Sequence, residues 1–132
     1  MHPAYIPKIA PHPNVEVFTQ VDDENLLKFY QEATALFLPL LDSTACNSLL
    51  EAMACGLPIT SADVGGNNRY LEETQSIICK KKDADGFIKE TVNLLRDEIR
   101  LKEIGQSARE KSCNLDWKQI SKQVEEFYST LF

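Results

Sequence analysis

Residues 47–66 read NSLLEAMACGLPITSADVGG and carry the strongest structural signals in this chain of 132 residues. The stretch opens with an apolar helical segment that contains a single carboxylate, Glu51. Gly56 supplies the left-handed residue that ends a helix, and Pro58 forbids its continuation. A short apolar run follows and ends at Gly65 and Gly66. A helix, a sharp stop and a buried strand in direct succession are typical of a parallel α/β sheet.

Strands and helices are also predicted on both sides of this stretch. The alternation of valines over residues 15–18 predicts a short strand, and the acidic run Asp22–Glu24 predicts the start of a helix. The continuous apolar run Ala35–Pro39 predicts a strand that is covered on both faces. Leu57–Ala62 and Ser76–Cys79 predict two more strands, so we expect an α/β fold with right-handed crossovers. The first helix carries its apolar residues at Leu26, Leu27, Tyr30 and Ala33.

Beyond Asp83 the pattern becomes helical throughout. Apolar residues at helical spacing predict three amphipathic helices. Their apolar stripes are Ile88, Val92 and Leu95, then Leu101, Ile104 and Ala108, then Trp117, Ile120, Val124, Phe127, Tyr128 and Leu131. The last stripe either packs on the local sheet or crosses to another domain and lacks its cover here, and the pattern leaves both readings open.

The composition limits the class of protein. A formal net charge of -6 does not favour a nucleic-acid partner. The 4 cysteines lack the spacing of a metal site and predict free thiols in a reducing compartment. We find no pattern of a secretory leader or a membrane span, so we expect a soluble, cytoplasmic protein. The proline-rich residues 1–13 predict an extended arm, and residues 14–132 predict a single domain.

The run Glu51–Pro58, EAMACGLP, together with the later Gly65–Gly66 loop, resembles the nucleotide-sugar-binding core of the retaining glycosyltransferase family 4. These enzymes have the GT-B fold, so the resemblance implies a Rossmann-like parallel sheet flanked by helices, with a helical C-terminus. It covers roughly residues 12–132 and corresponds to an incomplete GT-B C-terminal domain. The fold class that we expect is therefore α/β.

Open α/β sheets bind ligands at the carboxyl ends of their strands, where helix N-termini attract phosphate. The loop Asp42–Ser48 is expected at such a position, and Ser43 or Thr44 can cap the helix that follows. The resemblance implies that a nucleotide diphosphate lies near this helix start. It also implies that Glu51, further along the helix, accepts hydrogen bonds from both ribose hydroxyls. A Glu on a solvated helix edge is the other reading of Glu51.

The loop departs from the better-known family pattern. A Glu that touches the donor sugar is replaced here by Ser43, so Asp42 or Asn47 is expected to take over sugar or phosphate contacts. Asn47 either donates its amide to a phosphate oxygen or bonds its own backbone. The remaining nucleotide-sugar candidates are Thr44, the backbone N–H groups of Ser48 and Leu49, and Val21, which lies where the family reads the nucleobase. Gly65–Gly66 predicts either an ordinary turn or a point of close backbone approach.

The resemblance implies the C-terminal, donor-binding part of a retaining glycosyltransferase that moves a sugar from a UDP- or GDP-sugar to an acceptor. It implies no metal or other cofactor, and no catalytic residue is assigned. The Arg and Lys that neutralise the diphosphate in the family, and the N-terminal acceptor domain, have no counterpart in these residues. The isolated chain is therefore expected to need the missing N-terminal GT-B domain or a partner chain. The alternative is a non-catalytic nucleotide-sugar-binding or scaffold module.

Two further partners are compatible with this reading. One is a membrane surface, contacted peripherally through the full-length enzyme. The other is a second copy of the chain, which would form a homodimer by pairing at an unpaired sheet edge. Lysines 80–82 predict a solvated strand exit rather than a phosphate or membrane patch.

Overall fold

The computed structural model describes residues 12–80 and 82–131. Three parallel strands form one sheet in the order β1-β2-β3. They are β1 (Leu36–Leu38), β2 (Ile59–Ala62) and β3 (Ile77–Cys79). The helices are α2 (Asp23–Glu32), α3 (Asn47–Ala54), α4 (Asn67–Leu71), α5 (Ala84–Leu95), α6 (Glu98–Cys113) and α7 (Trp117–Ser129). The expected α/β class with a parallel sheet and a helical C-terminus is confirmed. The predicted arm over residues 1–13 lies outside the described residues, apart from His12 and Pro13.

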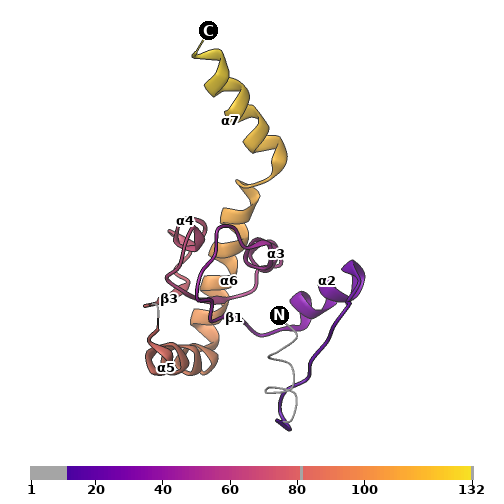
Figure 1. Cartoon of the computed structure of the whole chain (residues 1–132), viewed down its shortest axis with the longest axis vertical. Helices are drawn as coiled ribbons and strands as arrows, with labels where there is room; N and C mark the ends of the chain where they lie inside the picture. The colour runs from indigo at the N-terminus through magenta and orange to yellow at the C-terminus, as the bar shows by residue number, and fades with distance from the viewer. Residues whose placement is uncertain (1–11, 81, 132) are drawn as a thin grey trace.

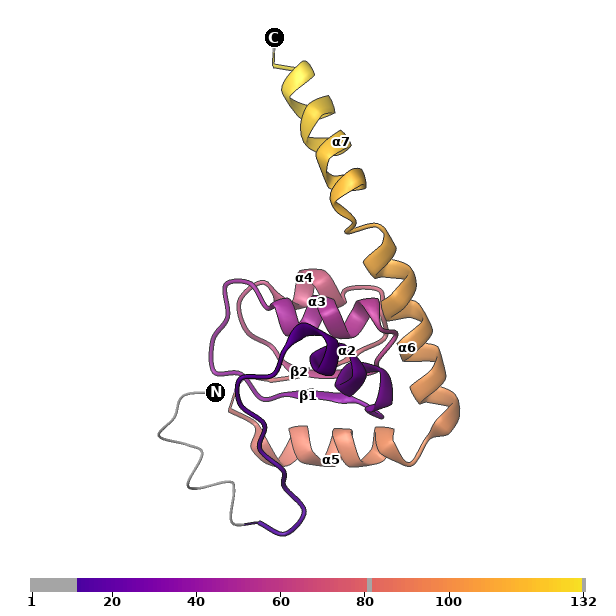
Figure 2. The same cartoon turned by 90° about the vertical axis from the view of Figure 1, so that its right-hand side faces the viewer.

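The sheet lies between two layers of helices. Figure 1 and Figure 2 show α3 and α4 on one face and α5 on the other. Register pairs such as Leu36 with Ile59 and Thr60 with Ile77 place the three strands side by side. Helix α6 runs past the end of the sheet at which β2 begins, so the opposite end, where the strands finish, is left to loops.

The end of α3 has the geometry that the Gly-Leu-Pro sequence predicts. Gly56 has a φ of +71°, its N–H donates to the Met53 carbonyl, and the Leu57 N–H donates to the Ala52 carbonyl. This pair of bonds is the Schellman arrangement, which satisfies the last carbonyls of a helix. The Pro58 carbonyl then accepts from the N–H of Leu36, which starts the pairing of β1 with β2.

Helix α6 connects two groups of buried side chains. One group lies between α3, β2, α4 and α6 and consists of Leu49, Ala52, Met53, Leu57, Ile59, Leu71 and Ala108. The other lies between β3, α5 and α6 and consists of Ile77, Cys79, Phe87, Leu94 and Ile104. Because Ile104 and Ala108 are one turn apart on α6, a single helix face packs against both groups.

The prediction for α5 placed the wrong stripe in the core. Ile88, Val92 and Leu95 are exposed, whereas Phe87, Thr91 and Leu94 are buried. The buried stripe has the same spacing as the predicted one but contains a polar residue. Its Thr91 hydroxyl donates to the Phe87 carbonyl at 2.8 Å, which removes the cost of burying that group.

The strand predicted over residues 15–18 is not formed. Residues 15–19 have no regular secondary structure, since a strand needs a neighbour to satisfy its backbone and none of the described strands lies beside them. Phe18 instead packs against Phe29 of α2, with ring centroids 4.7 Å apart. In the described sheet β1 is an edge strand, and its central Phe37 is 45% exposed.

Helix α7 extends away from the rest of the domain (Figure 1, Figure 2). Trp117 at its start is 84% exposed, and none of the helix's residues is buried. The reading in which this apolar stripe packs on the local sheet is therefore wrong. The stripe is uncovered by the described part of the chain.

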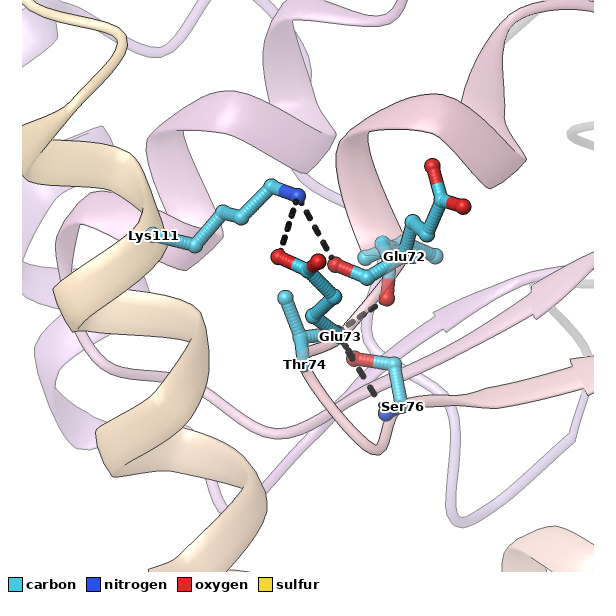
Figure 3. Close-up of polar contacts among 6 residues, drawn as sticks. Glu72, Glu73, Thr74, Ser76 and Lys111 are labelled. Atoms are coloured by element: carbon cyan, nitrogen blue, oxygen red, sulfur yellow. Dashed lines mark hydrogen bonds and ion pairs between the residues drawn. The ribbon is translucent and has the colours of Figure 1, made fainter.

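The turn between α4 and β3 is held by side chains (Figure 3). Lys111 of α6 donates to the Glu72 carbonyl at 2.9 Å and forms an ion pair with Glu73 at 3.5 Å. The buried Thr74 hydroxyl donates to the Leu71 carbonyl at 2.7 Å and accepts from the Ser76 N–H at 3.3 Å. These bonds compensate for the left-handed backbone of Glu73, whose φ is +68°.

Across residues 12–80 and 82–131, no helix combines the length and the apolar character that crossing a bilayer requires.

A substitution at Gly105 tests how closely α6 packs against the end of α3. A Cβ atom at this position would overlap the carbonyl oxygen of Gly56, so Gly105→Ala must push the two backbones apart. In an ordinary helix the same change stabilises by up to about 1 kcal/mol. We expect Gly105→Ala to lower the free energy of unfolding by about 1 to 3 kcal/mol, measured by urea denaturation. The neighbouring exposed change Gln106→Ala is the control, and equal stability of both variants would contradict the packing argument.

Candidate functional site

The candidate site lies at the carboxyl ends of the strands, at the end of the sheet opposite α6. The loop after β2 touches the loop after β1 at this end, because a Cβ at Gly65 would overlap the backbone of Ser43 and one at Gly66 would lie 3.3 Å from the Thr44 carbonyl. Gly65 has a φ of +52°. Both readings of the glycine pair are confirmed: Gly65 and Gly66 form a turn, and their backbone closely approaches the neighbouring loop.

Helix α3 has an uncapped N-terminus at this end of the sheet. The predicted capping by Ser43 or Thr44 is wrong: the N-cap is Cys46, which makes no side-chain capping bond, and the helix begins at Asn47. Four other helices are capped by an Asp side chain that accepts a backbone N–H, namely Asp22, Asp83, Asp97 and Asp116. The first backbone N–H groups of α3 therefore remain available to an anion.

The candidates in the first turn of α3 differ in what they can offer. Leu49 is fully buried, and its N–H already donates to the Cys46 carbonyl at 3.1 Å. Asn47 and Ser48 are exposed. Within the described residues the Asn47 side chain has no hydrogen-bond partner, so nothing there holds it to its own backbone. The N–H groups of Asn47 and Ser48 are thus the free donors of this helix.

The loop before α3 lines an open hollow of about 470 Å³. The residues that line it are Leu40, Asp42, Ser43, Thr44, Ala45 and Cys46. The Asp42 carboxylate accepts the N–H of Ser43 at 2.9 Å, which fixes the start of the loop. The structure thus brings three of the predicted residues, Asp42, Ser43 and Thr44, to one hollow beside the start of α3.

Glu51 is exposed on α3 and does not line this hollow. Its Oε2 atom accepts a hydrogen bond from the hydroxyl of Tyr30 at 2.9 Å. Ser48 lies on the same face of α3, three residues earlier, and its hydroxyl is near enough to Tyr30 to lower the pKa of that side chain. The exposed carboxylate of Glu51 therefore has a hydrogen-bond partner, and that partner belongs to α2.

Tyr30 is the residue that the sequence reasoning missed. It was assigned to the apolar stripe of the first helix, and its ring does pack against the buried group around Leu49 and Met53. A Tyr on the apolar stripe of a helix usually needs a hydrogen-bond partner for its hydroxyl. This need was the signal that could have pointed to a polar contact of Tyr30. Helix α2 starts directly after Val21 and its cap Asp22, whereas Tyr30 lies near the other end of the helix, about 13 Å further along its axis. The structure therefore does not bring Val21 to Glu51.

A second hollow lies at the ends of the strands and has a volume of about 130 Å³. Its walls are mainly apolar, with the lysines of the β3 exit at the rim: Pro39, Leu40, Leu41, Ala62, Lys80, Lys82, Asp83, Ala84 and Phe87. Lys80 and Lys82 are exposed, as expected for a solvated strand exit.

Comparison with known proteins identifies related sequences. The model of the family "Glycosyl transferases group 1" matches residues 7–111. The chain is 36% identical over 63 residues to N-acetyl-alpha-D-glucosaminyl L-malate synthase of Bacillus anthracis, which is 47% of this chain and 16% of that protein. It is 25% identical to D-inositol 3-phosphate glycosyltransferase of Corynebacterium urealyticum over 82% of this chain and 26% of that protein. It is 28% identical to the sulfoquinovosyl transferase of Arabidopsis thaliana over 82% of this chain and 22% of that protein.

A solved structure has the same fold. Sucrose-phosphate synthase from Thermosynechococcus elongatus superposes with a TM-score of 0.82 and 25% sequence identity. The match covers 98% of this chain and 33% of that one. The matched regions are thus between 16% and 33% of the lengths of these four proteins.

The contact between Tyr30 and Glu51 predicts a pH dependence. The pKa of Tyr30 lies above its ordinary value of 10.0, mainly because burial disfavours the charged phenolate. The Ser48 side chain lowers this pKa, and the Glu51 carboxylate raises it. The unfolded chain therefore ionises Tyr30 first, so its contribution to stability is full below pH 10 and is lost as the pH rises through the folded pKa. We expect the free energy of unfolding to fall more steeply above about pH 10 in the wild type than in Tyr30→Phe.

Urea denaturation across this pH range measures the difference. Tyr70→Phe is the matched control, since Tyr70 also packs against the buried group around Leu49. It should keep the wild-type slope. Identical slopes for the wild type and Tyr30→Phe would contradict the raised pKa.

Proposed function

The chain belongs to the glycosyl transferases group 1, and we propose that it is the donor-binding part of a retaining GT-B glycosyltransferase. In this proposal it holds a nucleotide sugar at the strand ends, with the diphosphate at the N-terminus of α3 and the ribose at Glu51. The observation that carries the proposal is the position of Glu51, one turn inside an uncapped helix N-terminus.

The diphosphate site follows from the start of α3. The backbone N–H groups of Asn47 and Ser48 and the helix dipole favour an anion there. Asn47 has an exposed amide that can donate to a phosphate oxygen. The hollow lined by Asp42, Ser43 and Thr44 is the adjoining space, and we assign it to the sugar end of the donor.

The ribose site follows from Glu51. The helix rise places the Glu51 backbone about 6 Å along the axis from Asn47. This spacing is comparable with the span of one ribose between its hydroxyl edge and its phosphate. Vicinal hydroxyls can each donate to a carboxylate oxygen, and such charge-assisted bonds are strong. The base would then lie near Glu51 on the side of α2.

We propose that transfer itself needs more than these residues. A departing diphosphate has to be neutralised and the acceptor has to be held beside the reacting carbon. The loop at the start of α3 offers a carboxylate and hydroxyls but no cation. We assign the cations to further strand-helix units of the same GT-B domain or to a partner chain, and the acceptor site to an N-terminal GT-B domain. We invoke no resident metal or cofactor.

The unpaired edge of β1 is the second reason to expect further chain. Phe37 at the centre of β1 is partly exposed, and Val15 and Phe18 in the segment before α2 are exposed too. Additional strands of the full enzyme, or a second copy of this chain, would cover this edge. We also propose a cytoplasmic location, because Cys46, Cys55, Cys79 and Cys113 are free thiols.

One observation favours a binding module without transfer. Ser43 replaces the carboxylate that touches the donor sugar in the better-known family pattern, and its backbone is packed against Gly65. Such a module would bind a nucleotide sugar but release no nucleoside diphosphate from it. Detection of sugar transfer by the full-length protein would exclude this second candidate.

Titration with UDP, GDP and ADP in a calorimeter tests the donor site directly. We expect one of them to bind to the chain, and Glu51→Gln to weaken that binding by roughly 1 to 3 kcal/mol through loss of the charged acceptor. Glu103→Gln, at an exposed position of α6 far from the strand ends, is the matched control. Unchanged affinity in Glu51→Gln would remove Glu51 from the site.

A further inference from the structure

Tyr30 makes a contact with Glu51 that crosses between two helices. Its hydroxyl donates to Glu51 Oε2 at 2.9 Å, although the two residues are 21 positions apart. No residue of α2 is fully buried, so the packing of the Tyr30 ring against the buried group of α3 is a main attachment of this helix. The ring is therefore held by the body of the domain, while the carboxylate that it contacts is exposed.

An exposed Glu side chain samples several rotamers, and fixing it for a ligand costs conformational entropy. A Tyr has only two rotatable side-chain bonds and can serve as a rigid donor. The bond to Oε2 restricts the rotamers that the Glu51 side chain samples before a ligand arrives. Preorganisation of this kind lowers the entropy lost on binding.

The hydrogen-bonding capacity of Glu51 leaves room for a ligand. An ionised carboxylate has about four acceptor positions, of which the Tyr30 hydroxyl uses one. Oε1 and the second position on Oε2 remain free for a pair of vicinal hydroxyls. Ser48, three residues closer to the helix start on the same face, also lies near Tyr30, so Tyr30 is close to both the diphosphate end and the ribose end of the proposed site.

We propose that Tyr30 is a positioning residue that orients Glu51 toward both hydroxyls of the ribose and thereby makes the donor site selective for ribonucleotides over 2′-deoxyribonucleotides. This inference rests on the proposed function. A purely structural role, in which Tyr30 only ties α2 to the domain, makes a different prediction. It weakens every nucleotide equally.

The test is calorimetric binding of UDP and 2′-deoxy-UDP to the wild type, Tyr30→Phe, Glu51→Gln and the double variant. GDP and 2′-deoxy-GDP replace them if GDP is the tighter ligand. We expect the wild type to prefer the ribonucleotide by roughly tenfold, the effect of one charge-assisted hydrogen bond. Tyr30→Phe should reduce this preference to about threefold or less, mainly by weakening UDP. In the Glu51→Gln background the same change should have no further effect.

Tyr30→Phe keeps the ring that packs against the core, and circular dichroism checks that each variant is folded. Tyr70→Phe is the control, because it also removes a hydroxyl from a half-buried ring, and it should leave both affinities unchanged. Equal weakening of UDP and 2′-deoxy-UDP by Tyr30→Phe would overturn this inference alone. An unchanged preference of Tyr30→Phe for UDP over 2′-deoxy-UDP would also overturn it. The same holds if the effects of Tyr30→Phe and Glu51→Gln on binding simply add in the double variant. Failure of the wild type to bind any of the nucleoside diphosphates would overturn the proposed function and this inference with it.

Discussion

The close approach of Gly56 and Gly105 is the contact on which the rest of the structure depends. Helix α6 can lie this close to the end of α3 only because Gly105 carries no side chain, whereas Gly56 is required by its φ of +71°. This places Ile104 and Ala108 against the two buried groups at once. Arg109 adds a hydrogen bond to the Ala54 carbonyl, so the C-terminal end of α3 is satisfied by α6 as well as by its own Schellman turn. The helix is thus anchored firmly at the end that faces away from the strand tips.

The opposite end of α3 has a different character. Its backbone donors are uncapped, the loop before it is braced by Gly65, and its exposed carboxylate has a partner on α2. A helix that is rigid at one terminus and unsatisfied at the other is suited to binding an anion, because the free N–H groups need not reorganise. The family relationship and the geometry of α3 therefore lead to the same proposal, in which the strand ends hold a nucleotide sugar.

The periphery of the domain carries apolar side chains that the described part of the chain does not cover. The edge of β1, the segment around Phe18 and the stripe of α7 that begins at Trp117 all leave apolar surface exposed. The sequence patterns of these segments are ordinary for a strand and an amphipathic helix. Each of them needs a neighbour, and the matched regions are between 16% and 33% of the lengths of the four compared proteins. The strand predicted over residues 15–18 was wrong for this reason, since alternation records which face is apolar but not whether a partner strand exists.

The sequence by itself determined the three strands of the sheet, the helices α2, α3 and α5 to α7, and the stop at Gly56 and Pro58, because these depend on local backbone preferences and periodicity. It did not predict the short helix α4. It did not determine which of two adjacent stripes of α5 is buried. The buried stripe contains the polar Thr91, whose hydroxyl is satisfied in the core by the Phe87 carbonyl and the Thr60 hydroxyl. Nor did the sequence reveal that Tyr30 meets Glu51. That contact joins two helices through the packed core, and a pairing between distant segments is decided only when tertiary structure places their side chains within hydrogen-bond distance.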